Sequence, residues 1–271
     1  MATHPPIVLV FAATDPTGGA GLQADILTLA SHGCHPVSVA TALTVQDTHG
    51  VRNVQAVESR WVEQQARALL EELPVAAFKL GVLGSAANVA VIAAILAENP
   101  EVPVVLDPVL ASARGDVLAS DATIAALREQ LLARTTVLTP NSREARQLAG
   151  APDTYELAEC AQRLIALGSA YVLITGTHEP GAEVVNTLYG AAGALHVARW
   201  QRLAGSYHGS GCTLASAIAA QLANGLEVRE AVRAAQAYTW RSLAAGFRPG
   251  TVQALPDRFF WARDMRHEME P

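Results

Sequence analysis

One stretch of the chain, residues 205–213, has residue types and a spacing that could bind an anion. It reads Gly-Ser-Tyr-His-Gly-Ser-Gly-Cys-Thr, and small apolar residues follow it over 214–220. Because the glycines do not suit a helix interior and the apolar run is typical of a buried helix, their junction predicts a helix N-terminus. Such a terminus offers free backbone N–H groups and the positive end of the helix dipole. Cys212 would lie in the first turn, where we expect a lowered thiol pKa.

A plainer interpretation is that these glycines only end a loop and that Cys212 is a small buried residue, since helices often begin after Gly or Ser. The rest of the chain supplies further polar candidates at loop positions, namely Asp25, Gln46, Asp107, Asn141 and Glu144. Each of these alone could be a helix cap or a surface residue. In a parallel sheet, however, the carboxyl ends of the strands share one edge, and Asp107 and Glu144 could hold a hydrated Mg²⁺ there with substrate phosphates.

The elements that must position these residues alternate between strands and helices. Continuous apolar runs and strand-like segments predict strands at 7–13, 37–43, 76–80, 102–106, 136–139 and 171–174, with a hairpin at 184–189 and 194–200. Helices are predicted at 22–31, 59–73, 85–98, 121–133, from 142, at 157–167, from the Cys212 turn and at 227–245.

This alternation predicts an α/β fold with a doubly wound, mostly parallel sheet, right-handed crossovers and helices on both faces. The hairpin would add an antiparallel edge. We find no internal repeat or linker, so residues 1–271 are predicted to form one domain with a more polar C-terminal tail from about 256. Phe259, Phe260 and Trp261 could pack that tail against the domain.

Composition argues against several classes of protein. Of the 271 residues, 51% are hydrophobic and 16% are charged, the net charge is −6, and no run of Lys or Arg occurs, which argues against nucleic-acid and anionic-membrane partners. The apolar run 7–13 is too short for a signal peptide or a membrane span. Three cysteines without a C-x-x-C pair favour the reducing cytoplasm. The His32-Gly33-Cys34-His35 segment looks metal-like, but it lacks a second pair of ligands.

Four motifs together carry a resemblance to a known family. They are Asp-Pro-Thr-Gly-Gly-Ala-Gly-Leu-Gln-Ala-Asp at 15–25, Asp-Pro-Val at 107–109, Thr-Pro-Asn-x-x-Glu-Ala at 139–145 and His-Gly-Ser-Gly-Cys-Thr-Leu at 208–214. In this order and spacing the chain, from about 7 to 245, resembles the bacterial hydroxymethylpyrimidine/phosphomethylpyrimidine kinases of thiamine biosynthesis, which are ribokinase-like. A Cys at the end of the glycine turn is particular to that branch, whereas most ribokinase-like enzymes have Asp there.

The resemblance implies a ribokinase-like fold and a reaction. The γ-phosphoryl group of ATP would be transferred, with Mg²⁺, to the hydroxymethyl group of 4-amino-5-hydroxymethyl-2-methylpyrimidine and then to the resulting monophosphate. By motif, the residues implied for the pyrimidine are Asp25, Gln46, Thr44, Gly18, Val82 and Val109. Those implied for the nucleotide and the metal are Asn141, Glu144, Thr175, Arg114 and Asp107. Gly209, Gly211 and Cys212 would form the anion hole.

The chain also departs from the family pattern at cationic positions. Thr175-Gly176-Thr177-His178 stands where many members have Lys-Gly-Gly-His, and Gly205-Ser206-Tyr207 stands where many have Lys-Asn-Thr. The common Ala-Lys-Ser-Gly segment reads Ala-Arg-Gly at 113–115. Two or three phosphate-binding cations are thus missing from their usual places, and we expect Arg114 to replace one, although Arg and Lys are not equivalent.

Two alternatives stay open at this stage. One is a pyridoxal kinase-like enzyme, and the other is a pyrimidine-binding protein on the same fold with little kinase activity. A homodimer is expected because half of the chain is apolar and related kinases associate. We also hypothesise that Cys212 accepts the proton of the alcohol when ionised and is neutral otherwise. A permanently charged Asp would instead repel the monophosphate.

Overall fold

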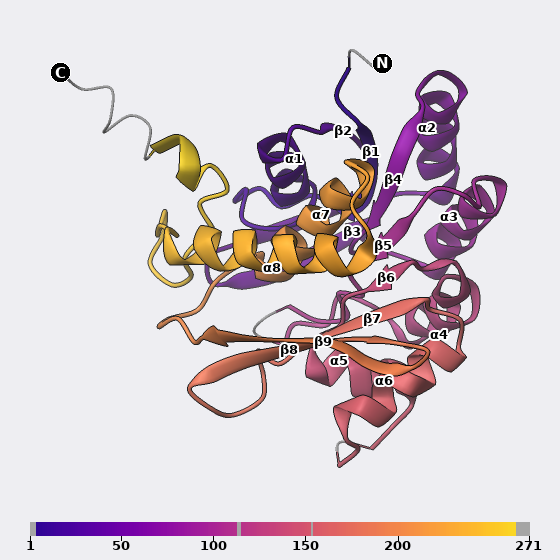
Figure 1. Ribbon diagram of the computed structural model, residues 1–271. Coiled ribbons are helices and arrows are strands. Elements are labelled where there is room, and N and C mark those ends of the chain that lie inside the picture. Colours follow the sequence, from indigo (N-terminus) through magenta and orange to yellow (C-terminus); the bar gives the residue numbers. More distant parts are fainter. Residues whose placement is uncertain (1–3, 113–114, 153, 264–271) are drawn as a thin grey trace.

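A computed structural model describes residues 4–112, 115–152 and 154–263 of the chain (Figure 1). Its strands are β1 (Ile7–Ala13), β2 (His35–Asp47), β3 (Gly50–Ala56), β4 (Val75–Leu80), β5 (Val104–Leu106), β6 (Val137–Leu138), β7 (Tyr171–Thr175), β8 (Glu183–Gly190) and β9 (Gly193–Gln201). Its α-helices are α1 (Gly21–Ser31), α2 (Ser59–Glu72), α3 (Ala86–Glu98), α4 (Asp121–Gln130), α5 (Ser142–Ala149), α6 (Leu157–Ala166), α7 (Ser210–Ala223) and α8 (Val228–Ala244).

All of these strands form one sheet in the order β3-β2-β1-β4-β5-β6-β7-β8-β9. Six neighbouring strands run parallel, namely β2, β1, β4, β5, β6 and β7. Strand β3 at one edge and the β8–β9 hairpin at the other edge are antiparallel. Every residue of β1 is buried, because a central parallel strand is covered on both faces and its sequence is therefore continuously apolar.

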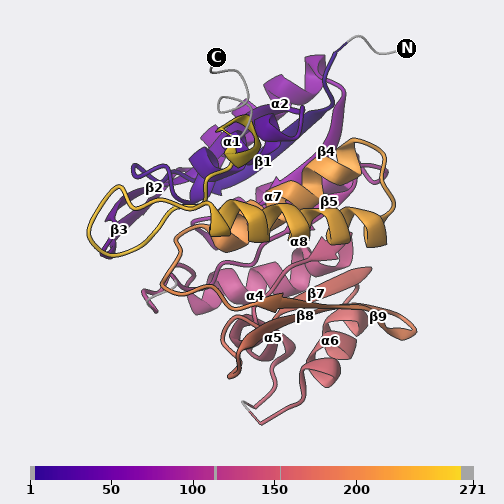
Figure 2. The same cartoon turned by 60° about the vertical axis from the view of Figure 1, so that its left-hand side comes forward.

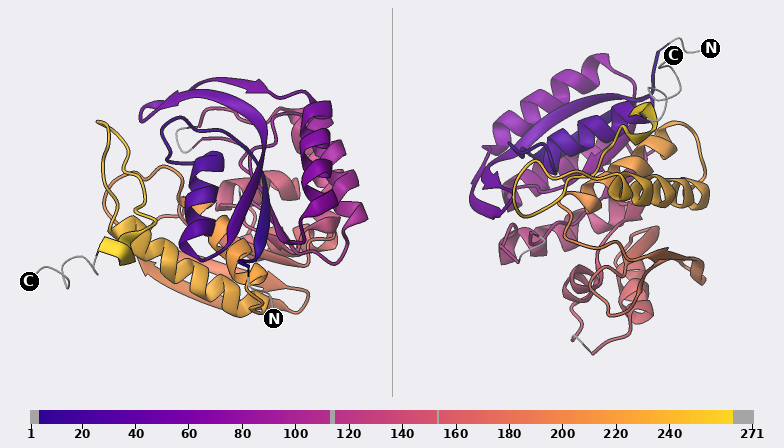
Figure 3. Two further views of the ribbon diagram at one scale, coloured as in Figure 1. Left: turned by 90° about the horizontal axis from the view of Figure 1, so that it is seen from above. Right: turned by 90° about the vertical axis from the view of Figure 1, so that its left-hand side faces the viewer.

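Helices cover both faces of the sheet (Figures 1 and 3). One apolar core joins the sheet to helices α2 to α6 through residues such as Val62, Ile92 and Leu164. The other joins it to α1, α7 and α8 through residues such as Leu22 and Ile218. The turned view in Figure 2 shows α8 lying along α7. The predicted doubly wound α/β fold is confirmed. Among the described residues, none of the helices combines the length and apolar character needed to cross a membrane.

The antiparallel β2–β3 pair was not predicted. Strand β2 continues beyond residue 43 to Asp47, so Gln46 lies in a strand and not in a loop as the sequence suggested. In this extension the exposed Leu43 and Val45 alternate with Thr44 and Gln46, as the two-residue period of a strand requires. The sequence signal is weak because β3 mixes polar and apolar residues, and neither β3 nor the 43–47 extension of β2 contains a buried residue.

The segment from residue 256 packs into the molecule, and of the three aromatic residues expected to do this Phe260 is buried, Phe259 is half-buried and Trp261 is exposed. Asp257, Arg258 and Phe260 are buried, and the backbone of Ala254 forms a bridge with Tyr207. Composition does not reveal that Asp257 and Arg258 are buried, because the partners of Arg258 are backbone oxygens and a hydroxyl elsewhere in the chain. The C-terminal segment therefore lies against the glycine-rich stretch that precedes α7.

Candidate active site

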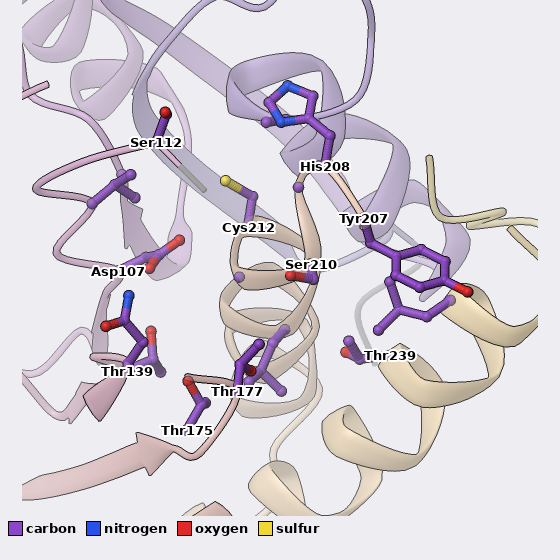
Figure 4. Close-up of a pocket in the computed structure, with 18 of the residues that line it drawn as sticks. Asp107, Ser112, Thr139, Thr175, Thr177, Tyr207, His208, Ser210, Cys212 and Thr239 are labelled. Atoms are coloured by element: carbon purple, nitrogen blue, oxygen red, sulfur yellow. The ribbon is translucent and has the colours of Figure 1, made fainter. Parts of the chain in front are cut away.

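A cavity of about 510 Å³ lies at the carboxyl ends of the parallel strands, facing the start of α7 (Figure 4). Eleven of the sequence-predicted site residues line it: Thr44, Gln46, Val82, Asp107, Val109, Asn141, Glu144, Thr175, Gly209, Gly211 and Cys212. Gly18 and Asp25 do not belong to its wall. Arg114 lies outside the described residues. The fold thus brings together residues that are up to 168 positions apart in the sequence, from Thr44 to Cys212.

Two glycine-rich segments meet in direct backbone contact at this cavity. We call residues 14–20 the Asp15 loop and residues 205–209 the glycine turn. Gly209 precedes α7 with a left-handed φ of 81°, and a Cβ atom at this position would lie 1.8 Å from the carbonyl oxygen of Gly19. Only glycine allows this approach. The contact fixes the start of α7, whose first N–H groups have no partner within the helix.

Asp15 ties the two segments together from one side. Its Oδ2 accepts hydrogen bonds from Ala20 N (2.7 Å), from Thr17 Oγ1 (2.9 Å) and from His208 Nε2 (2.8 Å), while Oδ1 accepts one from Thr17 N (2.9 Å). Burial works to raise the pKa of Asp15, but the bonds from His208, Thr17 and Ala20 outweigh it and lower the pKa. Asp15 therefore stays ionised and holds the glycine turn against the loop.

Asp25 lies beneath the cavity, where it forms a buried ion pair. Its Oδ2 accepts a hydrogen bond from Lys79 Nζ at 2.8 Å, and its Oδ1 accepts one from Ser216 Oγ at 2.7 Å. Burial works to lower the pKa of Lys79, but the charges of Asp25 and of further acidic neighbours such as Asp107, with the hydrogen bond to Asp25, together outweigh it and raise that pKa, so the ammonium stays charged. Sequence reasoning gave Asp25 a substrate contact, whereas the structure gives it Lys79 as a partner.

Lys79 is the functional candidate that sequence reasoning missed. It lines the cavity, and a Cβ atom at Gly81 would lie 2.9 Å from its Nζ. The available signal was a single lysine inside an otherwise apolar strand, two residues before a glycine. A buried lysine is rare unless it is paired, so it points either to a partner or to a site. Here it has both.

Asp107 and Glu144 face the same cavity as buried carboxyl groups. Asp107 Oδ2 has no hydrogen-bond partner within the described structure, and a Cβ atom at Gly211 would lie 3.6 Å from it. Burial raises the pKa of Asp107 to about 6, against the opposing effect of Lys79. Burial, and then the charge of Asp107, raise the pKa of Glu144 to about 8.

Glu144 and Asn141 form a capping box at the start of α5. Asn141 Oδ1 accepts hydrogen bonds from the N–H groups of Arg143 and Glu144, each at 3.0 Å, and Glu144 Oε2 accepts one from Asn141 N at 3.0 Å. Glu144 Oε1 accepts a further bond from Leu110 N at 3.3 Å. The helix-cap interpretation is therefore correct for both residues, and it places them at the cavity.

The carboxyl pair fits a magnesium ion that is held mainly by substrate phosphates. Mg²⁺ usually takes one or two protein carboxylates, and the unpartnered Asp107 Oδ2 is an oxygen of that kind. Across the described ranges, no group of three or more His, Cys, Asp or Glu side chains could hold a metal by itself. In the His32–His35 segment, His32 Nδ1 contacts Thr28 O at 2.9 Å and the Cys34 thiol accepts from Asn224 Nδ2 at 3.6 Å.

The predicted lowering of the Cys212 pKa is wrong. Burial raises the pKa of the thiol to about 12, and the charges of Asp107 and Asp25 add to the rise, while Lys79 opposes it. Cys212 occupies the first turn of α7 as expected, and its side chain lies at the cavity across from Asp107 (Figure 4). The helix terminus alone favours a thiolate, but burial beside two carboxylates outweighs that effect. Cys212 is therefore a neutral thiol near pH 7.

Comparison with known proteins assigns the chain to a family. A family model described as phosphomethylpyrimidine kinase matches residues 15–256. This chain belongs to the phosphomethylpyrimidine kinase family. A hydroxymethylpyrimidine/phosphomethylpyrimidine kinase from Streptomyces coelicolor is 40% identical over 246 residues, which cover 90% of each chain. The family recognised from the four motifs is thus confirmed.

Solved structures of related kinases have the same fold as this chain. The ADP complex of Bacillus subtilis pyridoxal kinase has a TM-score of 0.87 and 28% identity, covering 96% of this chain and 99% of that one. Phosphomethylpyrimidine kinase from Clostridium difficile has a TM-score of 0.75 and 32% identity, covering 86% and 97% of the two chains. The predicted ribokinase-like architecture is confirmed by both likenesses.

In the absence of divalent ions and nucleotide, we expect the Asp107→Asn variant to be more stable than the wild type at pH 8. We also expect it to lose most of its activity. Because the folded-state pKa of Asp107 lies above its ordinary 3.8, the folded protein loses stability as the pH rises from about 4 through 6. Asn cannot ionise and escapes this loss, which is about 3 kcal/mol for a rise of two pKa units.

The measurement is thermal unfolding from pH 4 to pH 8 in the presence of EDTA. The melting temperatures of the variant and the wild type should agree near pH 4 and separate by several degrees at pH 8. Glu101→Gln removes an exposed carboxylate and should leave the curve unchanged. A variant that is less stable than the wild type at pH 8 would contradict the assigned cost of the buried charge.

Proposed function

We propose that this protein transfers the γ-phosphoryl group of ATP to the hydroxymethyl group of 4-amino-5-hydroxymethyl-2-methylpyrimidine, and then to the monophosphate, in thiamine biosynthesis. The observation that carries the proposal is the juxtaposition in one cavity of Asp107, with its unpartnered Oδ2, and the glycine turn at the start of α7. Phosphoryl transfer needs an acceptor site beside an anion site, and membership of the family supplies the acceptor class.

The strand β2 end of the cavity suits the pyrimidine. Thr44 Oγ1 donates its proton to Thr14 O at 2.8 Å, so it must accept the hydrogen bond from Gln46 Nε2 at 2.7 Å. This order fixes the amide of Gln46 and leaves its Oε1 as an acceptor for the amino group of the pyrimidine. Val82 and Val109 supply apolar wall for the ring and its methyl group.

The α7 end suits the transferred phosphoryl group. The N–H groups of Gly211 and Cys212 lie at the helix terminus, where the helix dipole favours negative charge. Lys79 adds a fixed positive charge from below. We assign Asn141, Thr175 and Glu144 to the nucleotide side of the cavity. Mg²⁺, bound with the nucleotide phosphates near Asp107 and Glu144, would neutralise charge on the transferred group.

Asp107 is the side chain best placed to take the proton of the hydroxymethyl group. Mg²⁺ would contact Asp107 through its own water ligands, which leaves Oδ2, unpartnered within the described residues, to accept the proton. With a pKa near 6 the carboxyl group is largely ionised at pH 7 yet basic enough for this role. Cys212, with its raised pKa, holds its own proton and acts as a neutral neighbour. The second phosphorylation needs no base, because the attacking oxygen of the monophosphate is already anionic.

The test is coupled ADP formation with the pyrimidine alcohol, its monophosphate, pyridoxal and ribose as acceptors. We expect turnover with the first two and loss of at least 100-fold in kcat on Asp107→Asn, since the variant removes both the base and a metal-side charge. Tight pyrimidine binding by calorimetry without ADP formation would instead favour the non-catalytic binding protein.

Pyridoxal is the second candidate acceptor, and the likeness to Bacillus subtilis pyridoxal kinase is the observation that favours it. A higher kcat/KM for pyridoxal than for the pyrimidine in the same assay would decide for it. The family match and the acceptor oxygen of Gln46 favour the aminopyrimidine.

We further propose that the enzyme acts in the cytoplasm as a homodimer. The exposed side chains of Leu43, Val45 and Trp61 are apolar surface that a second copy could cover. Light scattering at micromolar concentration should give twice the mass of the chain, and a monomer would contradict the proposal.

Position 212 should decide whether one site can serve both acceptors. In Cys212→Asp, a new carboxylate would stand beside Asp107 and close to the incoming monophosphate. At about 4 Å a like charge costs about 1–4 kcal/mol, which slows that step about 5-fold or more. We expect the variant to keep much of the first reaction and lose most of the second.

Separate rate measurements with purified alcohol and purified monophosphate test this expectation. The matched control is Cys212→Ala, which removes the neutral thiol without adding charge and should slow both steps to a similar extent. A Cys212→Asp variant that phosphorylates the monophosphate as well as the wild type would show that charge is not the reason for the cysteine.

A further inference from the structure

Arg258 is a buried cation at the point where the Asp15 loop meets α7. Its Nη2 donates to the carbonyl oxygen of Gly19 at 2.5 Å, its Nη1 donates to that of Gly18 at 3.4 Å, and its Nε donates to Thr213 Oγ1 at 3.1 Å. Only 4% of the residue is exposed, and no carboxylate within the described residues lies at ion-pair distance from it.

The three acceptors of Arg258 lead to the same backbone contact. The carbonyl of Gly19 is the group against which Gly209 packs. On the other side, Thr213 Oγ1 donates to the carbonyl oxygen of Gly209 at 2.8 Å, so its lone pairs are free to accept from Arg258. Both members of the loop contact are thus held by one guanidinium group that comes from the C-terminal segment.

We infer that Arg258 is a positioning residue for phosphoryl transfer, which fixes the glycine turn through Gly19 and Thr213 and places a positive charge behind the start of α7. This inference rests on the proposed function. Arg258 does not line the cavity and therefore acts through the backbone of the turn and through its charge.

The energetics explain why a cation stands here. A buried charge without an ionic partner is costly and is tolerated only when hydrogen bonds satisfy it. The carbonyl oxygens of Gly18 and Gly19 are the negative ends of peptide dipoles beside a turn that is to bind an anion. The guanidinium group neutralises them and adds a field favourable to the phosphoryl group. Its planar donors are spread over three nitrogens and reach acceptors on both segments, whereas the donors of a lysine lie on a single nitrogen.

The main chain of the segment is anchored independently of the guanidinium group. Ser31 Oγ and Tyr238 Oη each donate a hydrogen bond to the carbonyl oxygen of Arg258 at 2.7 Å. Phe260 packs near Tyr238, with ring centroids 5.6 Å apart. Loss of the Arg258 side chain therefore leaves the segment attached, and Tyr238→Phe provides a control that loosens the segment but keeps the guanidinium group.

The experiment compares Arg258→Ala, Arg258→Lys and Tyr238→Phe in the kinase assay with the pyrimidine alcohol and ATP. We expect Arg258→Ala to lower kcat about 100-fold, the usual effect of losing preorganised stabilisation, with KM for the pyrimidine within about threefold of wild type. Arg258→Lys should recover part of the loss through its charge, and added guanidinium chloride at millimolar concentration should recover part of it in Arg258→Ala. Tyr238→Phe should lower the melting temperature and leave kcat within about twofold.

Several outcomes would overturn the inference. One is a kcat of Arg258→Ala close to that of the wild type, and another is an equal loss of kcat in Tyr238→Phe, which would show a purely structural role. If the wild type itself forms no ADP, the proposed function fails. Calorimetry with a non-hydrolysable ATP analogue then decides about Arg258: binding at least 10-fold weaker in Arg258→Ala supports the inference, and unchanged binding refutes it.

Discussion

The contact between Gly19 and Gly209 is the constraint on which the rest of the site depends. The two residues are 190 positions apart, yet a single Cβ atom at Gly209 would overlap the carbonyl oxygen of Gly19. Asp15 secures this contact through His208, and Arg258 secures it through Thr213. The start of α7 is therefore held by the Asp15 carboxylate on one side and by the Arg258 guanidinium group on the other.

The cavity is also lined and supported by buried charged groups, which differ in how far their charges are balanced by neighbours. Lys79 and Asp25 form an ion pair beneath the cavity, where Ser216 donates to the second oxygen of the carboxylate. Asp107 and Glu144 are compensated only in part, by the charge of Lys79 and by two backbone N–H groups respectively, and burial raises their pKa values. Natural proteins accept such a cost mainly where the groups serve a function, because an apolar pair of similar volume would be more stable.

The neutral Cys212 changes the division of labour in the proposed reaction. A thiolate beside the Asp107 carboxylate would place two negative charges where a phosphoryl group must bind. With a neutral thiol, only the charge of Asp107 remains there. The proton of the alcohol then falls to Asp107. This arrangement agrees with a site that accepts first an alcohol and then its more highly charged product. A neutral residue at position 212 still avoids repelling the monophosphate, but Cys212 no longer serves as the base.

The sequence by itself determined the alternation of elements, the position of most strands and helices, and eleven of the residues that line the cavity. Those signals are local, since apolar runs, caps and glycine turns act over a few neighbouring residues. Only the tertiary structure decided that Asp25 pairs with Lys79, that β2 continues through Gln46, and that Arg258 reaches the Asp15 loop. Burial beside other charges also set the pKa of Cys212. Each of these depends on groups that are distant in the chain, and electrostatic and packing energies are fixed by distance in space, which no local pattern records.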